Sequence, residues 1–369
     1  MERYPEWTLG VGSRIKAEAL RGLFQVARRV QSGRRGPFTE QAEFHHTHTA
    51  SYHWNESYYF NFTDPMNKVG GFTRIGMVPN QKTAIGILFL FLEDGSIEML
   101  TQSEPAEASR DEVQVGLLRY ERIRPLWEWR IAFQGRMLHL ENARMLLKLL
   151  EGEQPGDLGF HEVSVGLVFR GWSPCHDFKD MDLRAFAERV VAKGSRIQDL
   201  RAISKVASEH YEQVGACTGE IEIEGRSIPF VGSGHRDHSW GDRDWKAPSK
   251  WTWLTSQFDG TLGFNLSRVV IKSVDVINGF ISRGGRNYSI RRAHLETEFE
   301  ADGLTQKRIF LRLQDISGWD MEVVGTPLTV VPLVRDEAGH RTLVNEAFTE
   351  YRWKNHIGYG IAEYLHQLA

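Results

Sequence analysis

From about residue 40 onward, the chain consists mainly of short runs bounded by Gly, Pro, Asn or Asp, such as SYYFNFTDP, GFTRIGMVP and EVQVGLLRYERI. Apolar and polar residues alternate along several of these runs, which is typical of β-strands that bury one face. Asp94-Gly95 and Gln134-Gly135 are expected to join neighbouring strands as hairpins. The sequence therefore predicts a mainly β protein with antiparallel strands.

Helical periodicity is expected in two places. A segment near the N-terminus repeats apolar residues at near-helical spacing among arginines and lysines: Ile15, Ala19, Leu23, Ala27 and Val30. It is too charged for a signal peptide or a membrane span. It could lie on an anionic membrane surface, but we favour a helix that packs against the body of the protein. The second helical segment, about residues 180–213, is interpreted as a connector between domains.

The length of 369 residues favours two domains, because single cores rarely grow beyond ~250 residues. No βαβ alternation is visible, which counts against a doubly wound nucleotide-binding fold. We expect a helical segment over residues 1–36 and two tandem lipocalin-like (calycin) β-barrels over residues 37–213 and 214–369. The first of these domains would end with the helical connector. Barrels of about eight strands can enclose one small, mostly apolar ligand.

Charge and cysteine content limit the possible partners and location. The net charge of −3 gives no electrostatic reason to expect nucleic acid as a partner. Cys175 and Cys217 form no C-x-x-C pair, and no disulfide framework is indicated. We therefore expect a cytoplasmic monomer whose partner is a small apolar substrate.

Several familiar signatures are missing, and no cofactor is expected. The sequence has no G-x-S-x-G motif, and GSGHRD has Asp237 where a dinucleotide-binding loop needs its third glycine. HRDH matches the end of a dinuclear metal motif, but Ser233 stands where another histidine is needed. Three further possible metal ligands lie in EFHHTHT: His45, His46 and His48. A polar edge strand or loop explains them equally well, and no metal is assigned.

The segment SGHRDHSWGDRDW, residues 233–245, combines acidic, basic and aromatic residues. Alternation from Ile228 and Phe230 would place His238 and Trp240 on the face that points into a pocket. Asp237 would face the other way, unless a bulge at the preceding glycines shifts the phase. The alternative is that His238 is a hydrogen-bonded core residue within a salt-bridged turn.

A second candidate site lies in HWNESYYFNFTD. One face of this run is aromatic except for a single carboxylate: Trp54, Glu56, Tyr58, Phe60 and Phe62. If that face is interior, burial should raise the pKa of Glu56 and make it a candidate proton donor. The alternative is an ion pair between Glu56 and an arginine of a facing sheet.

The stretch GHRDHSWGDRDW, with the following WTWLTSQFDG, resembles the Gly-x-x-Asp-His-x-Trp-Gly segment of the carotenoid 1,2-hydratase (hydroxyneurosporene synthase)-like family. The resemblance implies two lipocalin-like domains and cofactor-independent chemistry on isoprenoids. The family's His-x-Trp residues fall on His238 and Trp240. Its downstream Tyr-x-Asp pair has no clean counterpart, and the nearest acidic position is Asp259.

The resemblance implies a hydro-lyase that hydrates an alkene or dehydrates a tertiary alcohol, such as a linalool dehydratase-like enzyme. We expect His238 with Asp237 or Glu56 as the acid/base pair. The expected substrate-binding side chains, which would shelter a carbocation, are Trp240, Trp54, Tyr58 and Phe60. The alternatives are a cyclase or isomerase on the same fold, a non-catalytic terpenoid carrier, and a metal-dependent hydrolase.

Overall fold

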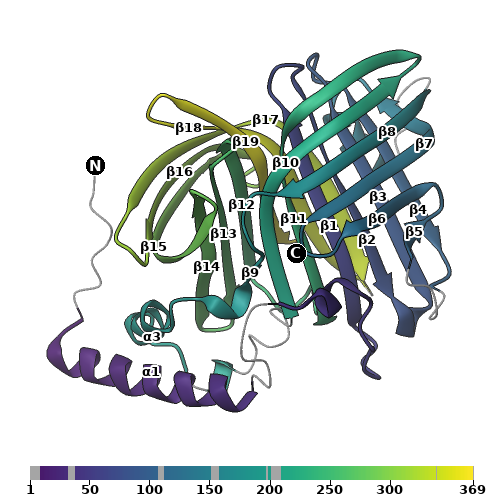
Figure 1. Ribbon diagram of the computed structural model, residues 1–369. Helices are drawn as coiled ribbons and strands as arrows, with labels where there is room; N and C mark the ends of the chain where they lie inside the picture. Colours follow the sequence, from purple (N-terminus) through teal and green to yellow (C-terminus); the bar gives the residue numbers. More distant parts are fainter. Residues whose placement is uncertain are drawn as a thin grey trace.

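The computed structural model describes residues 9–31, 38–106, 112–150, 158–196, 198–200, 209–337 and 339–368. Two antiparallel sheets lie side by side, and the second closes into a barrel (Figure 1). The expectation of a mainly β protein with an N-terminal helix is thereby confirmed.

The first sheet contains the first 11 strands of the described chain. Its strands are β1 (Trp54–Asp64), β2 (Val69–Val78), β3 (Thr83–Phe91), β4 (Ile97–Glu104), β5 (Val113–Val115), β6 (Leu118–Arg124), β7 (Glu128–Leu140), β8 (Gly159–Gly171), β9 (His176–Asp177), β10 (Glu209–Ile223) and β11 (Arg226–Asp242). Their order is β4-β3-β2-β1-β11-β10-β8-β7-β6-β5, and β9 pairs with β10. An additional pairing of β4 with β7 connects distant parts of this path.

The second sheet is a closed barrel in which each strand pairs with the next along the chain and the last pairs with the first. Its strands are β12 (Lys250–Asp259), β13 (Leu262–Ile271), β14 (Val274–Arg283), β15 (Arg286–Phe299), β16 (Gln306–Asp315), β17 (Asp320–Glu337), β18 (His340–Trp353) and β19 (His356–Gln367). Closure leaves no free edge on which another strand could add.

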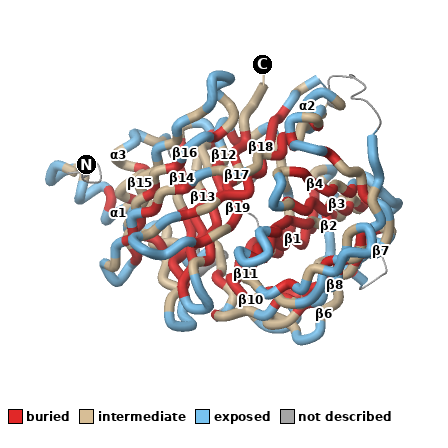
Figure 2. Tube along the Cα trace, turned by 90° about the horizontal axis from the view of Figure 1, so that it is seen from above, coloured by how far each residue is buried: buried red, intermediate tan, exposed pale blue. Residues whose placement is uncertain are grey.

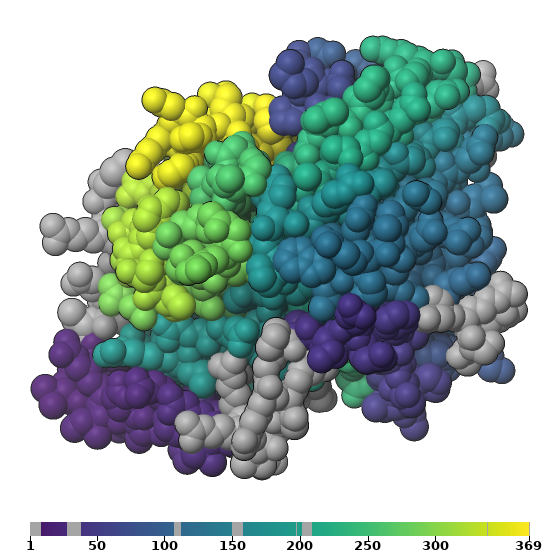
Figure 3. Space-filling view, viewed as in Figure 1, coloured from purple at the N-terminus to yellow at the C-terminus, as the bar shows by residue number. Residues whose placement is uncertain are grey.

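The helices lie outside the sheets. They are α1 (Val11–Gln31), α2 (Arg144–Leu150) and α3 (Leu183–Ala192), with short 3-10 turns η1 (Glu40–Glu43), η2 (Pro79–Gln81) and η3 (Phe178–Asp180). α1 lies along the edge of the molecule next to α3 (Figures 1 and 3). Ala17 is buried, and the ring centroids of Phe24 and Phe186 lie 5.0 Å apart. Ile15 and Leu23, two of the predicted apolar positions, are exposed.

No helix in the described part of the chain is long and apolar enough to cross a membrane. Contact of α1 with a membrane surface, the alternative to packing against the protein, stays a prediction. Val30 was assigned to the apolar positions of this helix, and its side chain lies outside the described residues.

Strand β1 is buried along its whole length because both of its faces are covered (Figure 2). Three of its even positions, Tyr58, Phe60 and Phe62, belong to the core of the first sheet. Tyr59 points the other way and packs with residues of the barrel, among them Trp253 and Phe348. The aromatic face predicted from HWNESYYFNFTD is therefore an interior face. The opposite face of the same strand forms the junction between the two sheets.

One of the two predicted hairpins is present. Gly95 has a φ of 87° in the turn between β3 and β4, a conformation that glycine adopts without strain. Gln134-Gly135 lies inside β7, where the two residues pair with Ser164 and Val163 of β8, so the prediction of a turn there is wrong. The surrounding alternation of buried residues holds this part of the chain in one long strand.

The change from sheet to barrel occurs between Asp242 and Lys250. The boundary expected between residues 213 and 214 falls inside β10, and both β10 and β11 pair within the first sheet. The helical connector is present as α3, but residues 209–213 are strand rather than helix. Residues 197 and 201–208 of the expected connector lie outside the described residues.

Candidate functional site

Strand β11 carries the segment SGHRDHSWGDRDW and lies between β1 and β10. The register places Tyr58 opposite His238 and Tyr59 opposite Asp237. Side chains therefore alternate between two environments along this strand, as the period of a strand requires. His238 lies inside the first sheet, and Asp237 faces the barrel. No bulge interrupts the pairing of β11 with β1 over this stretch.

A cavity of about 510 Å³ lies between the first sheet and the barrel. Its walls are mainly apolar and come from β1, β3 and β4 on one side and from β12 and β17–β19 on the other. The apolar lining includes Ile85, Ile87, Phe89, Met99, Leu146, Trp251, Trp253, Leu333, Val334 and Val344. The polar lining includes Tyr59, Arg74, His210, Asp237, Arg243, Glu346 and Glu363. A cavity of this volume, with a mainly apolar lining and a few polar groups, is typical of a small-molecule binding site.

Two carboxyl groups of the barrel face each other in this cavity. Glu346 of β18 and Glu363 of β19 are direct partners in the antiparallel register. Burial and then the charge of Glu363 raise the pKa of Glu346 well above its usual range, and burial also raises the pKa of Glu363. Two buried carboxylates side by side cannot both ionise cheaply. The pair therefore retains a proton at neutral pH.

Glu346 also has unused hydrogen-bonding capacity. Its Oε2 atom is buried and has no hydrogen-bond partner among the residues that the structure describes. The same holds for Oδ1 of Asp237, on the opposite wall of the cavity. Buried polar atoms usually have partners, so both atoms are suited to a group that enters the cavity.

The Asp237 wall carries an ionised histidine. His210 Nε2 lies 3.2 Å from Glu212 Oε1 and 3.5 Å from Asp237 Oδ2. Burial disfavours the charged imidazole, but the neighbouring carboxylates of Asp237 and Glu212 outweigh it and raise the pKa of His210 to about 9. Glu212 is fixed in turn by His235 at 2.8 Å and by the indole N–H of Trp253 at 2.9 Å. This wall therefore combines a cation with carboxylates.

Three arginines also line the cavity: Arg74, Arg243 and Arg335. Burial, together with the charges of Arg243 and Arg335, lowers the pKa of Arg74 to about 9. Arg74 donates to Asn55 Oδ1 at 3.1 Å. The guanidinium carbons of Arg243 and Arg335 lie 5.3 Å and 4.8 Å from the ring centroid of Trp245. These guanidinium groups could bind an anionic or strongly polar part of a ligand.

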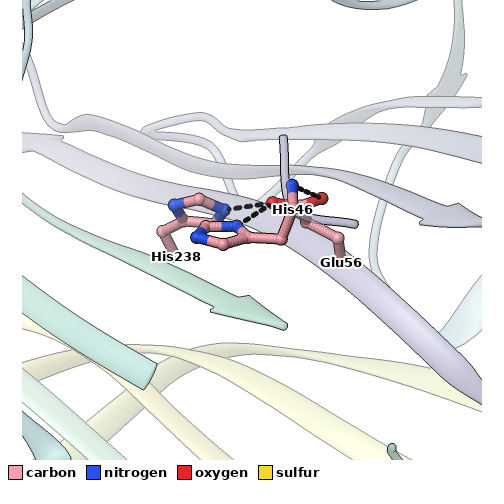
Figure 4. Close-up of side chains that lie close together, drawn as sticks. All are labelled: His46, Glu56 and His238. Atoms are coloured by element: carbon pink, nitrogen blue, oxygen red, sulfur yellow. Dashed lines mark hydrogen bonds and ion pairs between the residues drawn. The ribbon is translucent and has the colours of Figure 1, made fainter. Parts of the chain in front are cut away.

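The opposite face of β11 forms a separate cluster inside the first sheet (Figure 4). His238 Nε2 lies 2.9 Å from Glu56 Oε1, and His46 Nδ1 lies 2.8 Å from the same oxygen. The backbone N–H of His46 donates to Glu56 Oε2 at 3.1 Å, and His45 Nδ1 lies 3.6 Å from that atom. The structure thus brings together Glu56 and His238, which are 182 residues apart.

A buried relay continues beyond His238. Tyr211 Oη lies 3.1 Å from His238 Nδ1 and donates to Glu43 Oε1. Glu43 also accepts from Arg236 at 2.9 Å and from the indole of Trp129 at 2.6 Å. Burial alone would raise the pKa of Glu43, but the Arg236 charge and the Tyr211 hydrogen bond lower it. Glu43 is therefore a carboxylate.

Aromatic rings enclose the inner cluster. Trp240 stacks on His46 with 3.7 Å between ring centroids, and Tyr58 stacks on His238 at 3.9 Å. Trp54 is buried near Trp240 in a small cluster of its own. Phe60 lies deeper, in the main core of the first sheet. None of these predicted substrate-binding residues lines the cavity described above.

The expected pKa shift of Glu56 is wrong in sign. Burial raises it, but hydrogen bonds from His238, His45 and His46 outweigh burial, so the pKa of Glu56 is lowered. Burial lowers the pKa of His238, although the bond to Glu56 opposes this. The sequence indicates the desolvation of Glu56 but not the histidines that contact it in the fold. The partners of Glu56 are histidines rather than the arginine that was the alternative.

Sequence reasoning missed the carboxyl pair of the cavity, although the test that singled out Glu56 would have found it. Glu346 is flanked in alternation by Val344 and Phe348, and Glu363 by Ile361 and Leu365. Each carboxylate therefore has apolar neighbours on both sides along its face of the strand. Asp259, the nearest acidic counterpart of the resembled motif, caps the β12–β13 turn and does not line the cavity.

Comparison with known families and structures adds to this geometry. A domain of unknown function, DUF7064, matches residues 39–368. The chain belongs to this family. Among curated proteins, none matches the sequence significantly. The fold is similar to several solved structures.

An AttH-like protein from Nitrosomonas europaea has a TM-score of 0.58 at 14% identity, over 92% of this chain and 99% of that one. Kievitone hydratase from Nectria haematococca has a TM-score of 0.52 at 9% identity, over 90% of this chain and 96% of that one. CghA has a TM-score of 0.50 at 10% identity, over 86% and 88% of the two chains. At such identities the likeness shows a shared fold, and the function has to be argued from the site.

Proposed function

We propose that this DUF7064 protein is a hydratase- or cyclase-type enzyme that acts on a largely apolar substrate by acid–base catalysis in the cavity between the sheet and the barrel. The observation that carries the proposal is the buried pair of Glu346 and Glu363, which holds a proton beside an apolar chamber. The fold shared with kievitone hydratase supports this class of reaction. The resemblance of the Asp-His-x-Trp segment to carotenoid hydratases points in the same direction.

The carboxyl pair supplies the acid. In a dehydration, Glu346 donates its proton to the hydroxyl oxygen of a tertiary or allylic alcohol, the C–O bond breaks, and water leaves. Asp237 accepts a proton from the neighbouring carbon, and the electron pair of that C–H bond forms the new double bond. Hydration is the same sequence in reverse, with water adding to the alkene. A positioned acid or base contributes typically ~10² to 10⁴ in rate.

The walls of the cavity suit a positively charged transition state. The rings of Trp251, Trp253 and Tyr59 line the chamber, and aromatic faces attract a cation with about 0.5 to 2 kcal/mol per good contact. Apolar side chains from both sheets form most of the remaining surface. Arg74 and Arg243 also line the cavity and provide donors for a polar group of the substrate.

Product analysis tests the proposal. Purified protein is incubated with linalool, geraniol and longer prenyl alcohols, and with the corresponding alkenes, and products are identified by gas chromatography. We expect loss or addition of water, or ring closure, with at least one compound, and loss of this turnover in Glu346→Gln. Glu322→Gln is the matched control, because Glu322 lies on the barrel strand β17 outside the cavity. Tight binding without turnover across the panel would instead indicate a terpenoid carrier.

A further inference from the structure

The inner cluster of the first sheet has the composition of a metal site. We propose that His46 Nδ1, Glu56 Oε1 and His238 Nε2 bind a single divalent transition-metal ion of the zinc class. These atoms come from the segment before β1, from β1 and from β11, and they lie within 4.8 Å of one another (Figure 4). The proposal does not depend on the acid–base function of the cavity, which lies on the other face of β11.

The spacing of the three atoms is close to that of a coordination sphere. Each histidine nitrogen lies less than 3 Å from Glu56 Oε1, at 2.8 Å and 2.9 Å. Zinc binds imidazole nitrogen and carboxylate oxygen at ~2.0 to 2.2 Å, so tetrahedral ligands are ~3.3 Å apart. Each histidine nitrogen therefore needs to move away from Glu56 Oε1 by only a few tenths of an ångström to reach this separation. Imidazole and carboxylate together suit zinc and its neighbours in the first transition row.

The hydrogen bonds that link Glu43, Tyr211 and His238 give a reason for a cation between His238 and Glu56. Glu43 accepts hydrogen bonds from Arg236 and Trp129, and the hydroxyl hydrogen of Tyr211 is also directed to it. The remaining lone pair of Tyr211 Oη then accepts from Nδ1–H of His238. In the neutral imidazole only one nitrogen carries hydrogen, so Nε2 presents its lone pair to Glu56. With Nδ1–H donating to Tyr211, the contact between Nε2 and Glu56 Oε1 at 2.9 Å needs a positive charge, either a second proton on the ring or a metal ion.

The surroundings orient the ligands as outer partners do at metal sites. The second nitrogen of a metal-binding histidine usually donates to a fixed acceptor, and Tyr211 has this role for His238. The backbone N–H of His46 holds Glu56 Oε2, which leaves Oε1 for the ion. Stacking on Trp240 fixes the ring of His46. Three protein ligands leave a coordination position open, as at catalytic zinc sites.

Two other groups of possible ligands serve as comparisons. His139 and His161 both lie within 2.9 Å of Glu98 Oε1 through Nδ1. No hydrogen bond of the described residues fixes the tautomer of these two rings, so both can donate to Glu98 and no cation is needed. The other group, at His210, contains a single histidine between two carboxylates, and its imidazolium supplies the charge.

Metal analysis of the full-length protein tests the assignment without reference to turnover. Protein stripped with a chelator is titrated with Zn²⁺ by calorimetry, and bound metal is counted by elemental analysis after desalting. We expect one equivalent of zinc in the wild type and visible ligand-field bands when Co²⁺ replaces it. Less than about half an equivalent in folded wild-type protein would overturn the proposal.

Variants assign the ion to its ligands. Glu56→Gln and His46→Ala should lose stoichiometric zinc, and His46 is partly exposed, so its removal perturbs the core least. Tyr211→Phe should weaken binding by ~10- to 100-fold, as expected for loss of an outer hydrogen bond. Glu98→Gln is the matched control and should leave binding unchanged. Zinc that survives Glu56→Gln and His46→Ala, or that is lost in Glu98→Gln, would contradict the proposed site.

A spectroscopic measurement separates the ion from its simplest competitor. If a second proton on His238 satisfied Glu56, nitrogen NMR of the stripped protein and of the zinc-treated protein would show both ring nitrogens of His238 protonated. Metal binding predicts instead that Nε2 of His238 shifts on addition of zinc while Nδ1 keeps its hydrogen. An unchanged His238 signal in the presence of excess zinc would overturn the proposal.

Discussion

The two faces of β11 place buried carboxyl groups in opposite electrostatic environments. Inside the first sheet, Glu56 receives hydrogen bonds from histidines, and its pKa is lowered. Across the strand, in the cavity, Glu346 faces another carboxyl group, and its pKa is raised. Both glutamates lie between aromatic or aliphatic neighbours on their strand face and are almost fully buried. The neighbours, rather than burial itself, decide which one keeps a proton at neutral pH.

The largest expected difference between the two regions is in catalysis. Glu346→Gln should lower the turnover number by ~10² to 10⁴, because glutamine fills the same volume but cannot donate the proton. Glu56→Gln should have a much smaller effect, since Glu56 does not line the cavity. Steady-state kinetics with the substrate identified by product analysis, alongside circular dichroism to confirm folding, measures both. An equal or larger loss in Glu56→Gln would place the reaction at the inner cluster.

The next largest effect concerns stability on the inner face. Glu43→Gln leaves the fully buried Arg236 without its carboxylate and should lower the free energy of unfolding by ~3 to 5 kcal/mol. Lys68→Met, which removes an exposed ion pair with Glu93, should change it by no more than ~1 kcal/mol. Chemical denaturation of both variants provides the comparison. Similar losses of unfolding free energy in Glu43→Gln and Lys68→Met would show that the Glu43 carboxylate does not stabilise the buried Arg236.

The contributions of Glu346 and Glu56 to stability should also change with pH in opposite directions. The folded-state pKa of Glu346 lies above its unfolded value of 4.5, so its contribution to stability is complete below that pH and is lost as pH rises through the folded pKa. The pKa of Glu56 is lowered, so its contribution is present above 4.5 and is lost as pH falls. Each unit of pKa difference corresponds to ~1.4 kcal/mol.

Denaturation from acidic to neutral pH should therefore separate the two variants. Relative to the wild type, Glu346→Gln should gain stability as pH rises, whereas Glu56→Gln should be most destabilised at neutral pH. Parallel pH profiles for the two variants would contradict the assigned protonation states.

A smaller effect is expected at His210 on the Asp237 wall. Asp237→Asn removes the hydrogen-bonding carboxylate that contributes most to the raised pKa of His210, so this pKa should fall from about 9 toward 6.5. Glu212 also lies close to His210, so part of the increase in the pKa of His210 should remain in this variant. Proton NMR of the imidazole over a pH series measures the change. An unchanged pKa would mean that Asp237 does not bond to His210 in solution.

Much of the fold could be predicted from local patterns. The alternation in β1 identified a strand and its interior face, because a strand has a period of two. Gln134-Gly135 was mistaken for a turn because the sequence does not show that β8 pairs along the whole of β7. The domain boundary was placed too early because β10 and β11 join the first sheet through long-range pairing, including that of β11 with β1.

The site was predictable in part. Alternation along β11 correctly separated His238 from Asp237, and the pairing of Glu56 with His238 was expected across a large sequence separation. The position of the cavity was not predictable, because it depends on how the barrel packs against the outer face of β1. The carboxyl pair requires the cross-strand register of Glu346 and Glu363, and that register is set by the turn of the β18–β19 hairpin, where Trp353 pairs with His356.

Infrared difference spectroscopy of the protonated carboxyl group tests the central claim most directly. We expect the wild type at neutral pH to show the carbonyl stretch of a buried, protonated carboxylic acid. This band should disappear or shift in Glu346→Gln and in Glu363→Gln, and it should remain in Glu56→Gln. Absence of the band in the wild type at neutral pH, or its loss only in Glu56→Gln, would contradict a shared proton at the Glu346–Glu363 pair.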